Sequence, residues 1–323
     1  MITLMTISCT EDLPRAANAH VASELHAGLE AIEPWISPKF LYDALGSKLF
    51  EAICEVPEYY PTRTEAAIFA RHGAEMARVA GTGATLIDLG AGNCAKAASL
   101  FPLLSPSQYV AIDISSEFLC DALVRLRQRF PQIEMEGLGM DFSNSFELPP
   151  QVRAQQRLFF YPGSSIGNFT PEEAQAFLQR LRRQCGPDGG ILIGVDLAKD
   201  KAVLDAAYDD ALGVTGAFNL NVLRHVNQLI DADFDIRAWR HHGFYNPARG
   251  RVEMHLEALR RQEVSWDGGG RVFEAGDTIH TENSYKYQQA DAIALLERSG
   301  FEATRVWTDP QRWFAVIHAQ AVA

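Results

Sequence analysis

The chain has 323 residues, of which 47% are hydrophobic and 22% are charged, a composition typical of a globular protein. This length predicts two domains, or one large domain that carries an insertion. Acidic residues outnumber basic ones by 41 to 29, which argues against a nucleic-acid partner, and without an apolar run of about 18 residues no membrane-spanning segment is expected.

From about residue 84, short apolar runs alternate with segments of helical periodicity. Such alternation predicts a parallel sheet with helices on both faces. One helix start is well marked, because Thr170 is followed by Pro171 and two acids, a pattern typical of the first helical turn. Strands are predicted at 84–90, 108–114, 132–142, 157–165 and 189–198, and helices at 93–104, 115–130 (with a serine N-cap) and 170–184.

The alternation breaks between residues 197 and 286. This stretch contains a helical part at 201–230 and then strand-like pieces, two of which flank a turn at 246–250 and predict a hairpin. A helix at 287–300 and a final strand pair at 301–309 and 313–321 then complete a seven-stranded sheet. We therefore expect a doubly wound α/β domain at 64–196 plus 287–323, and a second, α+β domain at 1–63 plus 197–286.

A glycine turn follows the first strand and precedes a helix. Gly90 and Gly92 would let the backbone approach a ligand, beside the unpaired N–H groups of the helix start. Asp113 ends the next strand, where an acid can accept both ribose hydroxyls of an adenosine. Asp141 and Phe142 follow the third strand and could bind the adenine amine and cover its ring.

The signals at this edge have alternative explanations. The turn alone fits many nucleotide-binding sheets, and Phe142 could equally be a core residue. Lys96, one turn into the helix, is as well explained by solvation as by cofactor contact. An NAD-dependent oxidoreductase would usually show a third glycine, and the final strand pair also argues against it. Together the three signals favour S-adenosylmethionine (SAM) as the ligand.

Several longer motifs carry a resemblance that covers the chain from about residue 35 to its end. They are YDALGSKLFEAICEVPEYYPTRTEAAIF (42–69), GSSIGNFTPEEA (163–174), DLAKDKAVLDAAYDDALGVTGAFNLNVL (196–223), RVEMHL (251–256) and HTENSYKY (280–287). The sequence resembles the histidine-specific, SAM-dependent methyltransferases, which include the L-histidine Nα-methyltransferase of ergothioneine biosynthesis. The resemblance implies a class I (Rossmann-like) methyltransferase domain and a substrate domain made from the N-terminal segment and the insertion.

The resemblance also implies site residues and a reaction. Gly163 and Asn168 would face the amine and carboxylate of the substrate, with Tyr42 near the amine. The other implied contacts are Tyr59 and Tyr208 to the carboxylate, and Met254, Glu282 and Ser284 around the imidazole. Family members methylate the α-amine of free L-histidine three times, through its mono- and dimethylated forms, to hercynine, and leave S-adenosylhomocysteine (SAH). Tyr161-Pro162 and residues 306–314 depart from the family's pattern.

Glu282 and Ser284 suit an imidazole for a physical reason. They are two apart on a predicted strand, so their side chains share one face and Asn283 points away. Glutamate can accept from one ring N–H, and serine can donate to or accept from the other nitrogen. An indole would leave one group unmatched, at a cost of about 1–3 kcal/mol when buried. The alternative for Glu282 and Ser284 is a solvated strand face. Tyr59 and Met254 could instead be core packing residues, and Asn168 could instead shape a turn.

The prediction is therefore a SAM-dependent L-histidine Nα-methyltransferase. Methylation of another free amino acid such as tryptophan, or a non-catalytic SAM-binding regulator, are the alternatives. The five cysteines are scattered without metal-ligand spacing, and no signal peptide is visible, so we expect no metal and a cytoplasmic location. Only small-molecule partners are expected, with no nucleic acid and no membrane; the oligomeric state stays open, with a monomer possible.

Overall fold

The computed structural model describes residues 15–142 and 146–322. The described residues form two compact units. The first unit contains residues 61–198 and 286–322, and the second contains residues 15–60 and 199–285. The chain therefore passes from one unit to the other near residues 60, 198 and 285.

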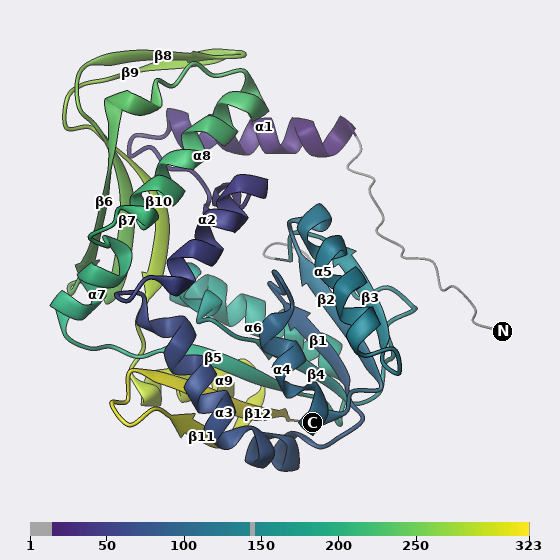
Figure 1. The fold of residues 1–323 in the computed structure, drawn as a ribbon. Helices are drawn as coiled ribbons and strands as arrows, with labels where there is room; N and C mark the ends of the chain where they lie inside the picture. Colours follow the sequence, from purple (N-terminus) through teal and green to yellow (C-terminus); the bar gives the residue numbers. More distant parts are fainter. Residues whose placement is uncertain (1–14, 143–145, 323) are drawn as a thin grey trace. The chain divides into compact units, whose positions relative to one another are not determined.

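The first unit is built on a seven-stranded sheet with the order β11-β12-β5-β4-β1-β2-β3 (Figure 1). Strands β1 to β5 run parallel, whereas β12 pairs antiparallel with both β5 and β11. The chain order reverses beside β1, which is the switch point where sheets of this kind bind ligands. The strands are β1 (Thr85–Leu89), β2 (Gln108–Asp113), β3 (Glu134–Gly139), β4 (Arg157–Tyr161), β5 (Gly190–Asp196), β11 (Phe301–Thr308) and β12 (Phe314–Ala321).

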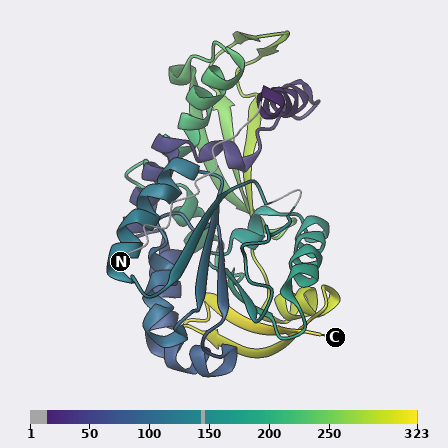
Figure 2. The same cartoon turned by 90° about the vertical axis from the view of Figure 1, so that its right-hand side faces the viewer.

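Helices cover both faces of this sheet (Figure 2). One core lies under α3 (Tyr60–Ala80), α4 (Ala95–Leu104) and α5 (Ser116–Arg129). The other lies under α6 (Pro171–Cys185) and α9 (Gln289–Arg298). Consecutive residues of β1, Leu86 and Ile87, belong to opposite cores, as the alternation of side chains along a strand requires. The predicted seven-stranded α/β fold is confirmed.

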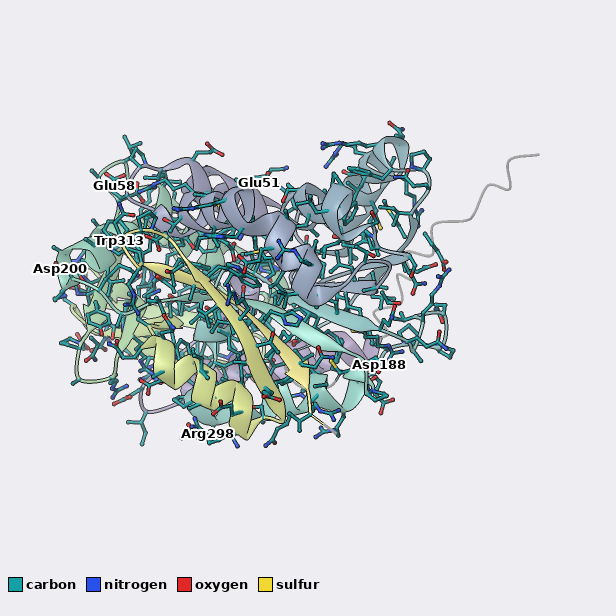
Figure 3. The ribbon with its side chains drawn as sticks, turned by 90° about the horizontal axis from the view of Figure 1, so that it is seen from below. Glu51, Glu58, Asp188, Asp200, Arg298 and Trp313 are labelled. Carbon is teal, nitrogen blue, oxygen red and sulfur yellow. The ribbon has the colours of Figure 1, made fainter. Side chains whose placement is uncertain are left out.

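The last two strands form the antiparallel pair that the sequence predicted. Their register joins Phe301 of β11 to Ala321 of β12, with a bulge between Ala303 and Arg305. Figure 3 labels Arg298, at the end of α9, and Trp313, directly before β12, near opposite ends of this pair. The pair thus extends the sheet beyond β5, with β12 running opposite to the parallel strands and β11 running in the same direction as they do.

Local signals explain where two of the helices begin. Thr170 and Glu173 form the full capping box of α6, because each side chain accepts the backbone N–H of the other. Ser115 occupies the N-cap position of α5, yet its side chain makes no capping hydrogen bond. The serine N-cap is therefore correct in position and wrong in mechanism; the Ser115 N–H instead donates to Asp113 Oδ1 at 2.9 Å.

The second unit is a three-stranded antiparallel sheet, β10-β7-β6, with helices on one side and a separate two-stranded hairpin, β8-β9 (Figure 1). The predicted hairpin around residues 246–250 is the β6–β7 connection. Its strands are β6 (Trp239–Asn246), β7 (Arg251–Ala258), β8 (Gln262–Trp266), β9 (Gly269–Phe273) and β10 (Thr278–Tyr285). Its helices are α1 (Arg15–Glu30), η1 (Pro38–Leu41), α2 (Ala44–Glu55), α7 (Lys201–Tyr208), α8 (Val214–Ile230) and η3 (Ile236–Ala238).

The structure divides the inserted segment more finely than the sequence pattern suggested. The helical part splits at residues 209–213, where α7 ends at Tyr208 and Gly213, with a φ of +74°, is the N-cap of α8. The strand-like piece predicted at 251–266 contains two complete strands, β7 and β8, and the piece predicted at 271–282 contains the end of β9 and the start of β10. Across the described ranges, no helix combines the length and apolar character that crossing a bilayer requires.

Candidate functional site

The glycine turn of the first unit leaves open space above its backbone. Gly90 and Gly92 have φ values of +69° and +52°, which side chains other than glycine rarely adopt. A Cβ added to either residue would meet no atom within 4 Å. The turn is therefore shaped by backbone conformation, and a ligand can approach it closely.

Asp113 holds the turn from the neighbouring strand. Its Oδ2 accepts the Gly92 N–H at 2.8 Å, while its Oδ1 accepts the Ser115 N–H. Burial raises the pKa of Asp113, and these backbone hydrogen bonds oppose that shift. Each carboxylate oxygen has a second lone pair. Asp113 can thus fix the turn and still accept ribose hydroxyls.

Asp88 lies beneath the same turn, at the end of β1. Its side chain is buried, and its Oδ2 accepts a hydrogen bond from Tyr109 Oη at 2.7 Å. Its Oδ1 has no hydrogen-bond partner among the described residues. Burial raises the pKa of Asp88 to about 7, so this carboxyl is partly protonated near neutrality.

Asp141 and Phe142 follow β3 at the same edge of the sheet, and both are half-buried. The Met140 N–H donates to the Asp113 carbonyl at 3.0 Å, which ties this segment to the end of β2. The Phe142 ring contacts Tyr161 and Phe177 of the core, at centroid distances of 6.2 and 5.8 Å. Its packing role is thus visible, and the predicted contact with adenine stays a prediction.

The turn after β4 carries the other predicted residues of this unit. Gly163 has a φ of +76°, and a Cβ there would lie 3.1 Å from Lys96 Nζ. The structure thus brings Lys96 and Gly163 together. Asn168 ends a short 3-10 helix, η2 (Ser165–Asn168), and its half-buried side chain makes no hydrogen bond in the described part of the chain.

These groups fit SAM as a bound molecule. The open glycine turn suits close approach of the cofactor, the Asp113 carboxylate suits ribose hydroxyls, and the unpartnered buried oxygen of Asp88 shows spare acceptor capacity beneath the turn. We call Gly90, Gly92, Asp113 and Asp141 the cofactor edge.

The second unit gathers its predicted residues around β10. Glu282 and Ser284 are both buried, whereas Asn283 between them is half-buried, in agreement with the predicted shared face. Met254 of β7 pairs with Glu282 in the strand register and is 2% exposed. Ser284 Oγ lies 2.8 Å from Tyr208 Oη, at the end of α7, and either can donate. We call Tyr59, Tyr208, Met254, Glu282 and Ser284 the Glu282 cluster.

A bulge in β10 sets the side-chain direction in this cluster. His280 pairs with His255 and Glu282 pairs with Met254, so Thr281 is the extra residue. The Thr281 side chain donates to the Met254 carbonyl at 3.1 Å. Because of the bulge, Thr281 and Glu282 are buried in succession, and the strand alternation that follows buries Ser284.

Aromatic contacts hold Tyr59 within this cluster and connect Tyr42 to it. Tyr59 packs edge-on against Tyr208, with ring centroids 6.0 Å apart. Phe50 contacts Tyr59 at 6.2 Å and Tyr42 at 5.6 Å, and Phe218 contacts Tyr42 at 5.5 Å. Sequence reasoning did not single out Phe50 and Phe218, since apolar residues on helices are ordinarily core residues.

Tyr59 is held as a neutral phenol. Burial raises its pKa well above the ordinary value, and the nearby Tyr208, Tyr42 and Glu282 raise it further. A phenol in this state is a hydrogen-bond donor. Its chemistry therefore suits a carboxylate ligand and does not suit the role of proton acceptor.

Three polar pairs, of which only Lys286–Asp196 is fully buried, were not anticipated from the sequence. In the first unit, Lys96 Nζ donates to Glu65 Oε2 at 2.7 Å, and the buried Lys286 and Asp196 form an ion pair at 2.8 Å. In the second unit, Lys199 Nζ donates to Tyr60 Oη at 2.6 Å. The partners are 31, 90 and 139 positions apart in the chain, so no local spacing reveals them.

Comparison with known proteins adds the decisive observation. The family model described as "Histidine-specific methyltransferase, SAM-dependent" matches residues 21–321. This chain belongs to that family. Its cofactor is accordingly SAM, and the protein is a SAM-dependent methyltransferase.

Two named relatives are similar over most of their length, and a third over part of it. The histidine N-alpha-methyltransferase of Mycolicibacterium smegmatis is 37% identical over 95% of this chain and 97% of its own. The histidine N-alpha-methyltransferase of Mycobacterium tuberculosis is 36% identical over 91% of this chain and 92% of its own. Ergothioneine biosynthesis protein 1 of Neurospora crassa is 32% identical over 83% of this chain, which covers 31% of that protein.

Proposed function

We propose that this protein methylates the α-amine of free L-histidine three times with SAM and forms hercynine, as the first step of ergothioneine biosynthesis. The family and the names of the similar relatives support this proposal. The single observation in the structure that carries it is the Glu282 cluster, in which a buried carboxylate and a buried hydroxyl share one face of β10.

The cluster suits imidazole through its mixed hydrogen-bonding capacity. Glu282 can accept the N–H of one ring nitrogen. The Ser284 hydroxyl, which shares a hydrogen bond with Tyr208, can reverse its direction and so match either state of the other nitrogen. Met254 presents an apolar, polarisable surface beside Glu282 for the flat ring.

The remaining residues would hold the amino-acid part of the substrate. Tyr59 and Tyr208 would donate to its carboxylate, in keeping with the raised pKa of Tyr59. Gly163 and Asn168 would face the amine and carboxylate, and the unbonded amide of Asn168 offers both donors and an acceptor. The half-buried Tyr42 ring could attract the ammonium as methyl groups accumulate.

SAM, when bound, supplies a methyl group on a positively charged sulfur. The substrate amine, once it has lost its proton, would take up that methyl group and leave SAH. The residues of the protein contribute mainly by orienting the amine, which can account for a large share of the barrier reduction. Three transfers use up the hydrogens and the lone pair of the amine, so the trimethylated product is final.

Incubation with SAM and an equimolar pool of the free amino acids, followed by mass spectrometry, tests the proposal. We expect mono-, di- and trimethylated histidine in succession, and no product when SAM is omitted. Methylation of tryptophan or another amino acid in place of histidine would contradict the assigned substrate. No methylated product at all would favour a non-catalytic SAM-binding role. The predicted cytoplasmic location and small-molecule partners stay predictions within this proposal.

A further inference from the structure

The carboxylate of Glu65 joins three separate elements of the first unit. Glu65 lies on α3 and is 0% exposed. Its Oε2 accepts from Lys96 Nζ of α4 at 2.7 Å, and its Oε1 accepts from the Gly163 N–H after β4 at 2.8 Å. One buried side chain thus contacts Gly163, which the family resemblance places at the substrate, and Lys96, a candidate cofactor contact.

Gly194 of β5 makes room for this carboxylate. A Cβ on Gly194 would lie 2.2 Å from Glu65 Oε1, a distance that real Cβ atoms essentially never show. The backbone of Gly194 lies outside the left-handed region, so its conformation does not itself require glycine. Glycine is instead required at position 194 because neighbouring side chains fill the space of a Cβ. Glu65 is the nearest of them, and the Phe314 ring would lie 3.0 Å from that Cβ.

Stability alone is a poor reason for such an arrangement. Burying a carboxylate is costly unless it is paired, and a buried ion pair often adds no net stability over apolar packing. Here the ammonium of Lys96 remains partly exposed, with 37% of its side chain accessible, while the carboxylate is fully covered. The partly exposed cation lies beside Gly163, which follows β4 at the carboxyl edge of the sheet, and its neutralising anion is buried.

We propose that Glu65 is a positioning residue that cancels the charge of Lys96 and orients Gly163, so that the positively charged sulfonium of SAM can bind at this edge. The inference rests on the proposed role of the cofactor edge and is independent of which amino acid is methylated. SAM carries a fixed positive charge on sulfur, whereas SAH has none. Without Glu65, the unopposed ammonium would disfavour SAM more than SAH.

The ratio of the SAM and SAH dissociation constants, measured by calorimetry without any amino acid, tests this inference. In Glu65→Gln, which preserves the shape of the side chain, we expect SAM to lose affinity at least about tenfold more than SAH, because an unopposed ammonium repels the charged sulfonium of SAM and not the neutral sulfur of SAH. Glu75→Gln is the matched control on α3, because Glu75 contacts Trp307 and Arg305. The control should leave both constants unchanged.

Two further variants separate charge from shape. Glu65→Gln/Lys96→Met removes both charges, so the ratio should return to the wild-type value even if both ligands bind less tightly. Gly194→Ala pushes the carboxylate aside without altering a charged residue, and should shift the ratio in the direction of Glu65→Gln. If Glu65→Gln does not fold, these two variants decide the question. Equal losses for SAM and SAH in Gly194→Ala, or an unrestored ratio in the double variant, would overturn the inference.

Discussion

The cofactor edge and the Glu282 cluster are built by different means. At the cofactor edge, the backbone sets the shape of the turn. Gly90 and Gly92 have positive φ angles, and backbone N–H groups donate to the Asp113 carboxylate. In the Glu282 cluster, side chains do so, through the Tyr208–Ser284 hydrogen bond and the register pair of Glu282 and Met254.

This difference has a consequence for specificity. A site made from backbone turns presents the same groups whatever the neighbouring side chains are, and it suits a cofactor shared by many enzymes. A site made from side chains changes its ligand when one residue changes. Substitutions in the Glu282 cluster should therefore alter the choice of amino acid, and substitutions at the cofactor edge should alter binding of SAM.

The largest effect is expected for Glu282→Ala. Loss of a buried, charged hydrogen-bond partner should lower kcat/KM for histidine about 100-fold, which corresponds to about 3 kcal/mol. The affinity for SAH, measured by calorimetry, should stay within about twofold of wild type because the cluster belongs to the second unit. Asn283→Ala, on the opposite face of β10, is the control and should retain most of the activity. An equally large loss of SAH affinity in Glu282→Ala would contradict the idea that this residue serves the amino acid and not the cofactor.

The second effect concerns the pH dependence of stability at the cofactor edge. Asp88 has a pKa raised from 3.8 to about 7, so the folded protein holds a proton that the unfolded chain releases at lower pH. The stability that this proton contributes is complete below about pH 4 and is lost as the pH rises toward 7. Between pH 5 and pH 7 the free energy of unfolding should fall by about 2 kcal/mol from this group.

Asp88→Asn provides the comparison. The amide oxygen can still accept the Tyr109 hydroxyl, but it does not titrate. Chemical denaturation at several pH values should show the variant gaining stability relative to wild type as the pH rises. A constant difference between the two proteins across this range would show that Asp88 does not titrate as described.

The third effect is expected for Gly92→Val. A β-branched residue at a φ of +52° costs about 1–2 kcal/mol, which a shift of the turn would relieve. SAH affinity should fall about tenfold as the turn opens, with KM for histidine almost unchanged at saturating SAM. Gly83→Val, at a φ of +81° in the loop before β1, is the matched control for strain alone. If both variants bind SAH equally, the turn is not part of the cofactor site.

The cofactor edge could be predicted from the sequence because its signals are local. A strand, a glycine turn and an acid at the end of the next strand are each read within a few residues, and the sheet topology brings them to one edge. The seven-stranded sheet was predicted from the alternation of strand-like and helix-like segments along the chain. By contrast, Glu65 meets Lys96 and Gly163 across 31 and 98 positions, and only the fold brings them together.

The Glu282 cluster was predicted through family resemblance and could not have been assembled otherwise. The shared face of Glu282 and Ser284 follows from strand alternation, but the bulge at Thr281 that turns this face inward has no sequence signature. The partnership of Ser284 with Tyr208, 76 positions away, depends on how α7 packs on the sheet. The sequence predicted a helical part at 201–230, but it did not show that residues 209–213 separate two helices there.

The smallest effect is expected from removing one hydroxyl of the Glu282 cluster. Tyr208→Phe removes the hydroxyl that shares a hydrogen bond with Ser284, worth about 0.5–1.5 kcal/mol, so kcat/KM for histidine should fall about three- to tenfold. Ser284→Ala should cost a similar amount. If both hydroxyls act on the same ligand through their shared hydrogen bond, the double variant should lose less than the product of the two single effects. Multiplicative losses would show that Tyr208 and Ser284 serve different parts of the substrate, with Tyr208 on the carboxylate and Ser284 on the imidazole.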